Sequence, residues 1–574
     1  MFTIDLIPIL LILHCCLINF FKTFISAQGV LLFSIGTFIY ILLIATKNII
    51  TILQIGSFIY LDYGQWFFFF NLFDSNLVFI FDMLALIGVL LVSFLTPLAL
   101  LFGSEYMFRE PFLMRLLLLL NFFATSVILL FVSYDLFLII LAWEFIGLFS
   151  LLLVNFYATR VFTIKAALKT FIFSRISDMF LFTFLLVTLY LFQSFDLSLI
   201  FIQTPFFVFH YIFFGPFALH YLSVMAFCLL LSGLIKSAQF GFHIWLPDAM
   251  EAPTPASALI HSSTLVVAGI FLIFRFSLFC DFTPIILQVT ALWGGLTLSS
   301  ASIIAIFQKD IKKLVAYSTI SQIGYLVSGC GLLAYNETLL YLIIHALNKA
   351  FLFILVGYIV HFFNNNTDLR FMGSVWLLNF DVLILLFSLI FNLIGLPYSA
   401  GFLSKDLLLL FFFKASNLYY LTGICWLISL ICSPIYMTIF LTKVFFSIIK
   451  TTNQQNWMYY FTNRNYFYST TLLSPLTFFI FFFFWILIWF GLTSMYSVVF
   501  AFNSAVSNSI IFSFFPLSFN PLLTIYYTPY SLLSAITSFI YFNLFNTCIL
   551  WFLMSYKNNY FTPYVALLSL LIFF

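Results

Sequence analysis

Long apolar runs, each able to cross a lipid bilayer, follow one another along almost the whole chain of 574 residues. A transmembrane helix needs about 20 mostly apolar residues to cross ~30 Å of hydrocarbon. Only 7% of the residues are charged and 64% are hydrophobic, whereas a soluble domain carries about 25% charged residues. Short segments that alternate apolar and polar residues, typical of a transmembrane β-barrel, do not occur in this sequence. The sequence therefore predicts an all-α polytopic membrane protein.

Polar breaks between the apolar runs predict about 15–16 transmembrane helices. Thirteen regular spans are expected near 4–21, 30–46, 77–102, 113–133, 136–156, 166–192, 221–243, 254–277, 284–307, 311–333, 337–362, 378–413 and 418–447. Two more are expected near 471–496 and 530–555, in a less regular tail. We expect four parts: leading helices 1–3 in 1–112, five-helix bundles in 113–280 and 281–448, and C-terminal helices in 449–574.

The basic residues are distributed unevenly between the predicted loops. Loops after odd-numbered helices hold Lys22, Arg109, Arg115, Arg160, Lys165, Lys169, Lys309, Lys312, Lys313, Arg370, Lys443, Lys450 and Arg464. Before the tail, loops after even-numbered helices hold only Lys47, Arg275 and Lys414. Because basic loops stay on the side where synthesis occurs, the amino terminus is predicted on the opposite side.

Once the loop residues are set aside, a short list of ten ionisable residues remains at membrane depth. They are Asp82, Glu144, Arg175, Asp178, Lys236, His261, His345, Lys349, Lys405 and Asp406. Each lone charge at membrane depth costs at least a few kcal/mol, so such residues pair, face a wet cavity or carry ions. For any single one, structural pairing and function are equal alternatives. Ten of them, spread from the third to the twelfth helix, favour a hydrated polar axis through the protein.

The spacing of these residues separates pairs from isolated amines. Arg175 and Asp178 are three residues apart, which allows a pair on one helix face, and for this pair alone a structural role is the simpler reading. His345 and Lys349, four apart, also share a face.

Three of the lysines, Lys236, Lys349 and Lys405, have no acidic residue three or four positions away. Because desolvation disfavours the charged form of an amine, such lysines can exchange a proton. A carboxylate such as Glu144, at a changing distance from one of them, would switch its proton affinity.

Helix-breaking residues lie next to two of these lysines. Lys236 stands between Gly233 and Gly241, and Lys405 follows NLIGLPYSAGF, which contains Pro397. Proline removes a backbone donor and kinks or unwinds a helix. Corresponding interruptions in two halves indicate inverted repeats with ion sites near the midplane. We therefore expect two inverted five-helix repeats, helices four to eight and nine to thirteen, with broken helices 7 and 12.

Seven motifs carry a resemblance to a known family. They are FDMLALIGVLLVSF (81–94), WEFIGLFSLLLVNFY (143–157), SRISD (174–178), SGLIKSAQFGFHIWLPDAMEAPTPASALIHSSTLVVAGIFLIFR (232–275), QKDIKKLVAYSTISQIGYL (308–326), HALNKAFLF (345–353) and GLPYSAGFLSKD (395–406). In this order they resemble the antiporter-like subunits of respiratory complex I, the mitochondrial NADH:ubiquinone oxidoreductase. The ALIHSST form with His261, and Lys at 405, resemble the subunit 5 family rather than the subunit 4 family.

This resemblance implies a role for each buried residue. Glu144 and Lys236 would form the input pair, His261, His345 and Lys349 the central relay, and Lys405 the exit, with Arg175 and Asp178 in support. The implied activity is proton translocation as a subunit of NADH:ubiquinone reductase (H+-translocating). No cofactor or metal is expected on this chain, because NADH, FMN, iron–sulfur clusters and ubiquinone would be bound by other subunits.

The family further implies partners and a location. The expected partners are membrane-arm subunits of complex I, above all antiporter-like subunit 4, together with accessory subunits and lipids such as cardiolipin; nucleic acid is not expected. The expected location is the mitochondrial inner membrane, with the amino terminus on the intermembrane-space side. Two alternatives remain open: a sodium/proton antiporter of the multi-subunit type, and a scaffold whose buried charges merely pair.

The chain departs from the family pattern at three places. Tyr341 stands where family members usually have a further His, so that relay step would use a phenol or a water. Asn348 replaces a usual Phe and adds polarity beside Lys349. Residues 497–574 carry Pro516, Pro521, Pro529 and Pro563, which predicts a lateral-helix region that is shortened, divergent or contributed by another chain.

Overall fold

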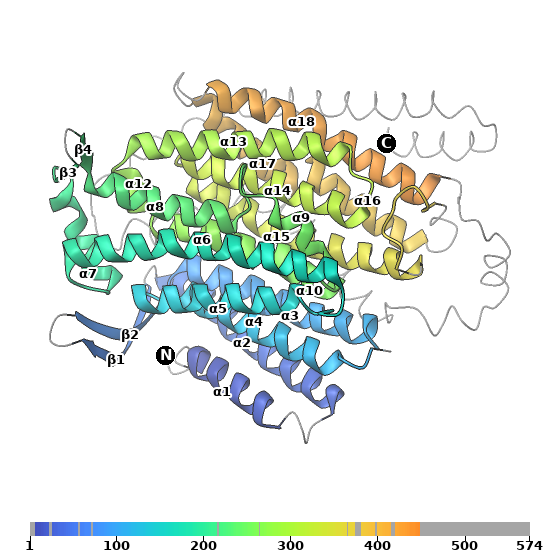
Figure 1. Cartoon of the computed structure of the whole chain (residues 1–574), viewed down its shortest axis with the longest axis horizontal. Helices are drawn as coiled ribbons and strands as arrows, with labels where there is room; N and C mark the ends of the chain where they lie inside the picture. The colour runs from blue at the N-terminus through green and yellow to red at the C-terminus, as the bar shows by residue number, and fades with distance from the viewer. Residues whose placement is uncertain are drawn as a thin grey trace.

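A computed structural model describes residues 6–21, 26–55, 58–69, 73–108, 110–214, 217–262, 264–363, 365–373, 380–396, 399–414 and 420–447. Within these ranges the long helices lie side by side in one bundle, with α1 to α5 on one side and α13 and α18 on the other (Figure 1). Nine of the described helices are long and apolar enough to cross a membrane. The prediction of a helical, multi-pass membrane protein is confirmed.

The long helices of the described part have the following bounds. They are α1 (Leu6–Phe21), α2 (Ala27–Ile55), α3 (Met83–Tyr106), α4 (Leu113–Val132), α5 (Leu136–Val154), α6 (Val161–Phe192), α8 (Tyr221–Lys236), α10 (Thr254–Ser262), α11 (Leu265–Arg275), α13 (Pro284–Ile306), α14 (Ile311–Gly331), α15 (Tyr335–Phe362), α16 (Phe380–Ile394), α17 (Ala400–Lys414) and α18 (Tyr420–Leu441). Shorter helical pieces are α7 (Leu197–Gln203), η1 (Thr204–Phe207), α9 (Trp245–Asp248), η2 (Ala249–Glu251), α12 (Ser277–Asp281) and a π turn, η5 (Thr442–Phe446).

Two antiparallel β-hairpins, which the apolar pattern did not predict, lie at one end of the bundle (Figure 1). One pairs β1 (Ile59–Phe69) with β2 (Phe73–Phe81), and the other pairs β3 (Tyr211–Phe214) with β4 (Phe217–His220). The span expected near 77–102 therefore began too early. The helix starts only at Met83, because the Asp82 side chain caps it by accepting a hydrogen bond from the Ala85 amide at 2.8 Å.

Three other expected spans are interrupted. The span 221–243 was too long, because α8 ends at Lys236 and a turn follows. The span 254–277 consists of α10 and α11, and the span 378–413 consists of α16 and α17. The inverted relation of two repeats, and the division at 113–280 and 281–448, stay predictions. The tail helices expected in 449–574 lie outside the described residues.

Glycines let several helices approach closely. A Cβ built on Gly294 of α13 would lie 2.4 Å from the Ser328 backbone nitrogen of α14, and one on Gly269 of α11 would lie 2.4 Å from the Gly233 carbonyl oxygen of α8. Hydrophobic burial does not drive helix association inside lipid, so close van der Waals contact through small residues replaces it. This packing holds α8, which carries Lys236, and α14 in fixed positions.

Candidate functional site

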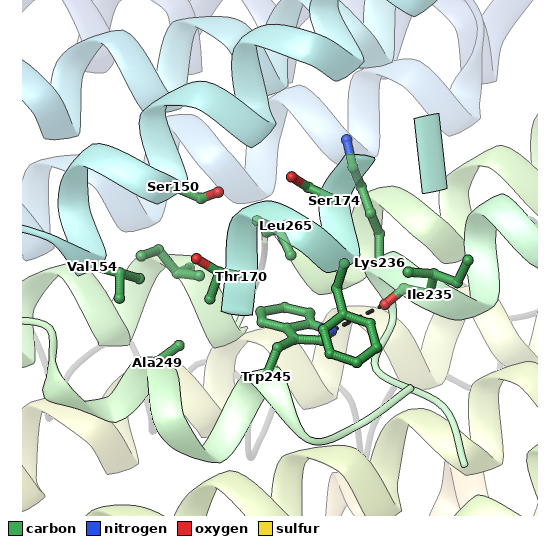
Figure 2. Close-up of a pocket in the computed structure, with 11 residues that line it drawn as sticks. Ser150, Val154, Thr170, Ser174, Ile235, Lys236, Trp245, Ala249 and Leu265 are labelled. Atoms are coloured by element: carbon green, nitrogen blue, oxygen red, sulfur yellow. Dashed lines mark hydrogen bonds between the residues drawn. The ribbon is translucent and has the colours of Figure 1, made fainter. Parts of the chain in front are cut away.

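Lys236 is the last residue of α8, and it lines a small cavity among α5, α6, α8 and α9, which η2, α10 and α11 also help to enclose (Figure 2). Three hydroxyl side chains share this lining, from Ser150 on α5 and from Thr170 and Ser174 on α6. The cavity offers about 20 Å³ to the centres of water-sized molecules, roughly the space that one water needs. Figure 2 also shows Trp245 at the cavity, where its indole Nε1 donates to the Ile235 carbonyl at 3.2 Å.

The Lys236 amine is bound mainly by uncharged groups. Its Nζ donates to the Trp143 carbonyl oxygen at 2.7 Å and lies 3.8 Å from the centroid of the Trp143 ring. The nearest carboxylate oxygen, Oδ1 of Asp178, is 3.8 Å away. Lys236 is only 2% exposed. The amine is therefore desolvated, and the Asp178 carboxylate lies at the outer limit of an ion pair.

Glu144, Arg175 and Asp178 complete a network with Lys236. Nη1 of Arg175 lies 2.5 Å from Glu144 Oε2 and 3.5 Å from Asp178 Oδ2, so the predicted pair of Arg175 with Asp178 is present. The expected input pair of Glu144 with Lys236 stays a prediction: here the Glu144 carboxylate binds the Arg175 guanidinium, and the carboxylate that faces Lys236 is that of Asp178. Arg175 thus lies between two carboxylates, one of which also faces Lys236.

A second group of buried residues lies on α14 and α15. The Lys349 Nζ donates to the Ser318 hydroxyl at 2.6 Å, and Lys349 is 0% exposed. His345, one turn earlier on α15, is 1% exposed. Neither ring nitrogen of His345 has a hydrogen-bond partner within the part of the chain that the structure describes. His345 and Lys349 are therefore brought together as predicted from their spacing.

His261 lies near the end of α10, which packs against α15. Its imidazole is fully buried, 6.1 Å from the ring centroid of Phe353, and neither of its nitrogens is hydrogen-bonded to another described residue. Among the described residues, His261 is therefore hydrogen-bonded neither to the Lys236 network nor to His345 and Lys349.

Lys405 is held by the broken end of α16. Its Nζ donates to the carbonyl oxygens of Leu393 and, at 3.4 Å, Ile394. Gly395 follows with a φ of 85°, a left-handed conformation that glycine adopts without a steric penalty. A Cβ at Gly395 would also lie 3.2 Å from Cδ of Lys405. The interruption before α17 thus turns two carbonyl groups of a helix terminus towards a buried amine.

Two sets of polar residues escaped the sequence analysis. Arg275 was expected in a loop, yet it is 9% exposed and forms a salt bridge with Asp82, Nη1 to Oδ2 at 2.5 Å. Uncharged side chains also matter: Gln322 on α14 binds Tyr341 of α15 and Tyr436 of α18. A search for charged residues could not find these uncharged side chains, although SQIGY (321–325) places Gln322 within an apolar span.

The chemistry of this arrangement follows from the partners of the amines. Lys236, Lys349 and Lys405 each bind an uncharged oxygen. An ammonium has three donors and a neutral amine keeps two and gains an acceptor, so an uncharged partner accommodates both states. A buried amine that is locked to a carboxylate would instead be held in its charged form. The described residues also contain no group of three or more His, Cys, Asp or Glu side chains that could hold a metal ion.

Comparison with known proteins gives the family. Residues 133–433 match the family model described as NADH:quinone oxidoreductase/Mrp antiporter, TM, and the chain belongs to this family of transmembrane proteins. Within it, the chain belongs with the proteins called NADH-ubiquinone oxidoreductase chain 5. It is 38% identical to that protein of Paramecium tetraurelia over 419 residues, which are 72% of each chain. The resemblance to the subunit 5 family is confirmed.

Other relatives are matched over a smaller share of their length. The chain is 43% identical over 360 residues to NADH-ubiquinone oxidoreductase chain 5 of Nyctotherus ovalis, covering 62% of this chain and 20% of that protein. It is 38% identical over 355 residues to chain 5 of Chondrus crispus, covering 61% and 53% respectively. The chain thus spans between a fifth and about half of the length of these two relatives.

Two solved structures share the fold. A chain of the Mrp complex from Dietzia sp. DQ12-45-1b superposes with a TM-score of 0.68 at 21% identity, covering 92% of this chain and 56% of that one. A chain of the membrane-bound sulfane sulfur reductase, an archaeal respiratory membrane complex, gives a TM-score of 0.71 at 17% identity, covering 88% and 99%. At these identities the likeness shows the fold alone.

Proposed function

We propose that this chain is a proton-translocating membrane subunit of NADH:ubiquinone oxidoreductase, respiratory complex I. One observation carries the proposal: Lys236, Lys349 and Lys405 are each at most 2% exposed, and each amine binds an uncharged oxygen. Ion pairing alone does not account for such amines, whereas proton exchange does. The relatives of this chain bear the name NADH-ubiquinone oxidoreductase chain 5.

In the proposed mechanism, Arg175 sets the charge that Lys236 experiences. Its guanidinium lies between Glu144 and Asp178, closer to Glu144. A shift towards Asp178 would neutralise the carboxylate that faces Lys236 and favour release of the lysine proton. A shift back would favour proton uptake. Protons released by Lys236 would pass through His261, His345 and Lys349 to Lys405.

The exposed side of the Lys236 network is a reason to expect a neighbouring subunit there. The side chains of Arg175 and Glu144 remain 41% and 24% exposed on α6 and α5, well inside helices long enough to span the membrane. Charges facing hydrocarbon are costly, so we infer that another membrane-arm subunit covers this face. Antiporter-like subunit 4 is our candidate, with accessory subunits and cardiolipin elsewhere. NADH, FMN, the iron–sulfur clusters and ubiquinone would be bound by other subunits.

The distribution of basic residues supports an orientation. Arg115, Arg160, Lys309, Lys313 and Arg370 lie in or beside the turns at one end of the bundle. The first described helix, α1, begins at Leu6 at the other end, near β1 and β2 (Figure 1). By the positive-inside rule, the amino terminus would lie in the intermembrane space and the basic end in the matrix, with the protein in the mitochondrial inner membrane.

Reconstitution of the complete complex into proteoliposomes tests the proposal. We expect Lys236→Met to leave assembly intact and to slow proton translocation by about a hundredfold, the usual effect of losing a proton-transfer group. Glu144→Ala should act in the same direction. The matched control is Lys169→Met on α6, because Lys169 is 49% exposed and pairs with Asp248, the last residue of α9. A Lys236→Met complex with normal proton-to-electron stoichiometry would contradict the proposal.

A sodium/proton antiporter is the second candidate, because the Mrp complex shares the fold. The same vesicles separate the two functions. Proton uptake that requires NADH and quinone, and that is unchanged when sodium is replaced by potassium, supports the complex I subunit. Proton movement driven by a sodium gradient without NADH supports the antiporter.

A further inference from the structure

Three buried polar side chains join α14, α15 and α18 beside His345. The Tyr341 hydroxyl donates to Oε1 of Gln322, and Nε2 of Gln322 donates to the Tyr436 hydroxyl at 3.3 Å. Tyr341, Gln322 and Tyr436 are 2%, 1% and 0% exposed. The amide thus binds both phenols at once, and its own position is fixed from two sides.

This arrangement decides how Tyr341 can act towards its other neighbours. A phenol has a single proton to donate, and its oxygen can also accept. Because the proton of Tyr341 is donated to Gln322, the phenol oxygen offers only acceptor capacity to other groups. Gln322 therefore sets the polarity of Tyr341.

His345 is the group that needs such an acceptor. It lies one turn from Tyr341 on α15, with ring centroids 6.4 Å apart, and its nitrogens have no hydrogen-bond partner among the described residues. A protonated imidazole has two N–H donors, and leaving a buried charged donor unsatisfied is costly. The charged groups whose fields reach this ring are Lys349, one turn further along α15, and Lys405 on α17. Both are cations when protonated, so neither can accept.

We propose that Gln322 is a positioning residue for proton transfer at His345: it takes the hydroxyl proton of Tyr341 and so presents the phenol oxygen as an acceptor to the histidine. This inference rests on the proposed proton-translocating function. The transferred proton enters and leaves on the ring nitrogens of His345, and Tyr341 keeps its own proton throughout. Tyr436 holds the amide of Gln322 in the orientation that makes this possible.

A purely structural role for the chain Tyr341–Gln322–Tyr436 is the competing explanation, since it also ties three helices together. A second hydrogen bond of the same kind provides a matched control. The hydroxyls of Tyr325 on α14 and Ser429 on α18 lie 2.6 Å apart and are equally buried. Ser429→Ala breaks this link between α14 and α18 and removes no hydrogen bond of Tyr341 or Gln322, although the Tyr325 ring packs against that of Tyr341.

The test uses the complete complex in proteoliposomes with the variants Tyr341→Phe, Gln322→Met, their combination, Tyr341→His and Ser429→Ala. We expect Tyr341→Phe and Gln322→Met each to slow proton translocation about five- to tenfold, the equivalent of one buried hydrogen bond. The double variant should be no slower than either single variant, because both remove the same acceptor. Tyr341→His should restore the rate, since an imidazole N–H can donate to Gln322, and Ser429→Ala should leave it unchanged.

Lys349→Met in the same preparation separates this inference from the proposed function. If Lys349→Met abolishes translocation while Tyr341→Phe and Gln322→Met leave it unchanged, the inference alone is overturned. If Lys349→Met has no effect, the proposed function fails first. Multiplying losses in the double variant, or an equal loss in Ser429→Ala, would show that the chain only ties helices together. Should Gln322→Met prevent assembly, Tyr341→Phe still decides, because it removes one oxygen and keeps the ring.

Discussion

Removing Arg275 should destabilise the protein far more than removing both members of its ion pair. Arg275 and Asp82 are 9% and 5% exposed, and the guanidinium binds both carboxylate oxygens, at 2.5 Å and 3.3 Å. Nη2 of Arg275 also donates to the Phe131 carbonyl at 3.2 Å. The pair therefore connects α11 with the start of α3 and the end of α4. In Arg275→Met the Asp82 carboxylate is left buried without its counter-ion.

The size of the effect follows from this burial. An uncompensated buried charge costs about 3–5 kcal/mol, whereas replacing both partners by uncharged residues is often close to neutral. With a factor of ten for every 1.4 kcal/mol, Arg275→Met should raise the unfolded fraction by about two to four powers of ten. In the double variant, Asp82→Asn keeps an oxygen that can cap α3 at Ala85, so most of the loss should be recovered.

Buried thiols report the unfolding. Cys280 on α12 and Cys330 on α14 are free, and they are 4% and 1% exposed, so a thiol-reactive dye labels them only after the surrounding helices open. Labelling of the purified complex is followed in detergent as the temperature rises. Equal stability of Arg275→Met and of the double variant would refute the reasoning, because the destabilisation is attributed to the lone carboxylate.

Three further predictions concern packing, pH and the surface. Gly294→Ala should destabilise the protein by about 1–3 kcal/mol in the same dye assay, because its Cβ would lie 2.4 Å from the Ser328 backbone nitrogen, whereas Gly36→Ala on α2, with nothing within 4 Å, should not. The Arg370 hydrogen bond lowers the pKa of Asp368. The stability that this interaction contributes is therefore fully present above the unfolded-state pKa of about 3.9, and it is lost as the pH falls through the lower folded-state pKa. Hydrogen exchange of residues 365–373, corrected for intrinsic rates, should therefore speed up below about pH 4, and Arg370→Gln should remove this difference. Asp248→Asn breaks a half-exposed pair with Lys169 and should change stability by less than about 1 kcal/mol; a loss as large as that of Gly294→Ala would contradict the surface assignment.

The sequence alone predicted the features that depend on how each segment interacts with lipid. Runs of apolar residues must become helices in lipid, because a backbone without water has to satisfy its own hydrogen bonds. The sequence also singled out Lys236, Lys349 and Lys405, because an amine in an apolar run is exceptional wherever it lies. The breaks beside Lys236 and Lys405 were expected from Gly and Pro. The two hairpins were missed, because they fall largely in the breaks between expected spans, at 47–76 and 193–220, where no regular element was expected.

The tertiary structure decided which groups meet. Glu144 and Arg175 belong to different helices, and nothing in the order of residues shows that the guanidinium takes the carboxylate expected for Lys236. Arg275 lies at a helix end by sequence and becomes buried only because α3 and α4 surround it. Gln322 draws no attention in a search for charges until two phenols from other helices bind its amide. Hydropathy is a property of each segment and can be read from it, whereas the partner of a buried polar group depends on how several segments pack together.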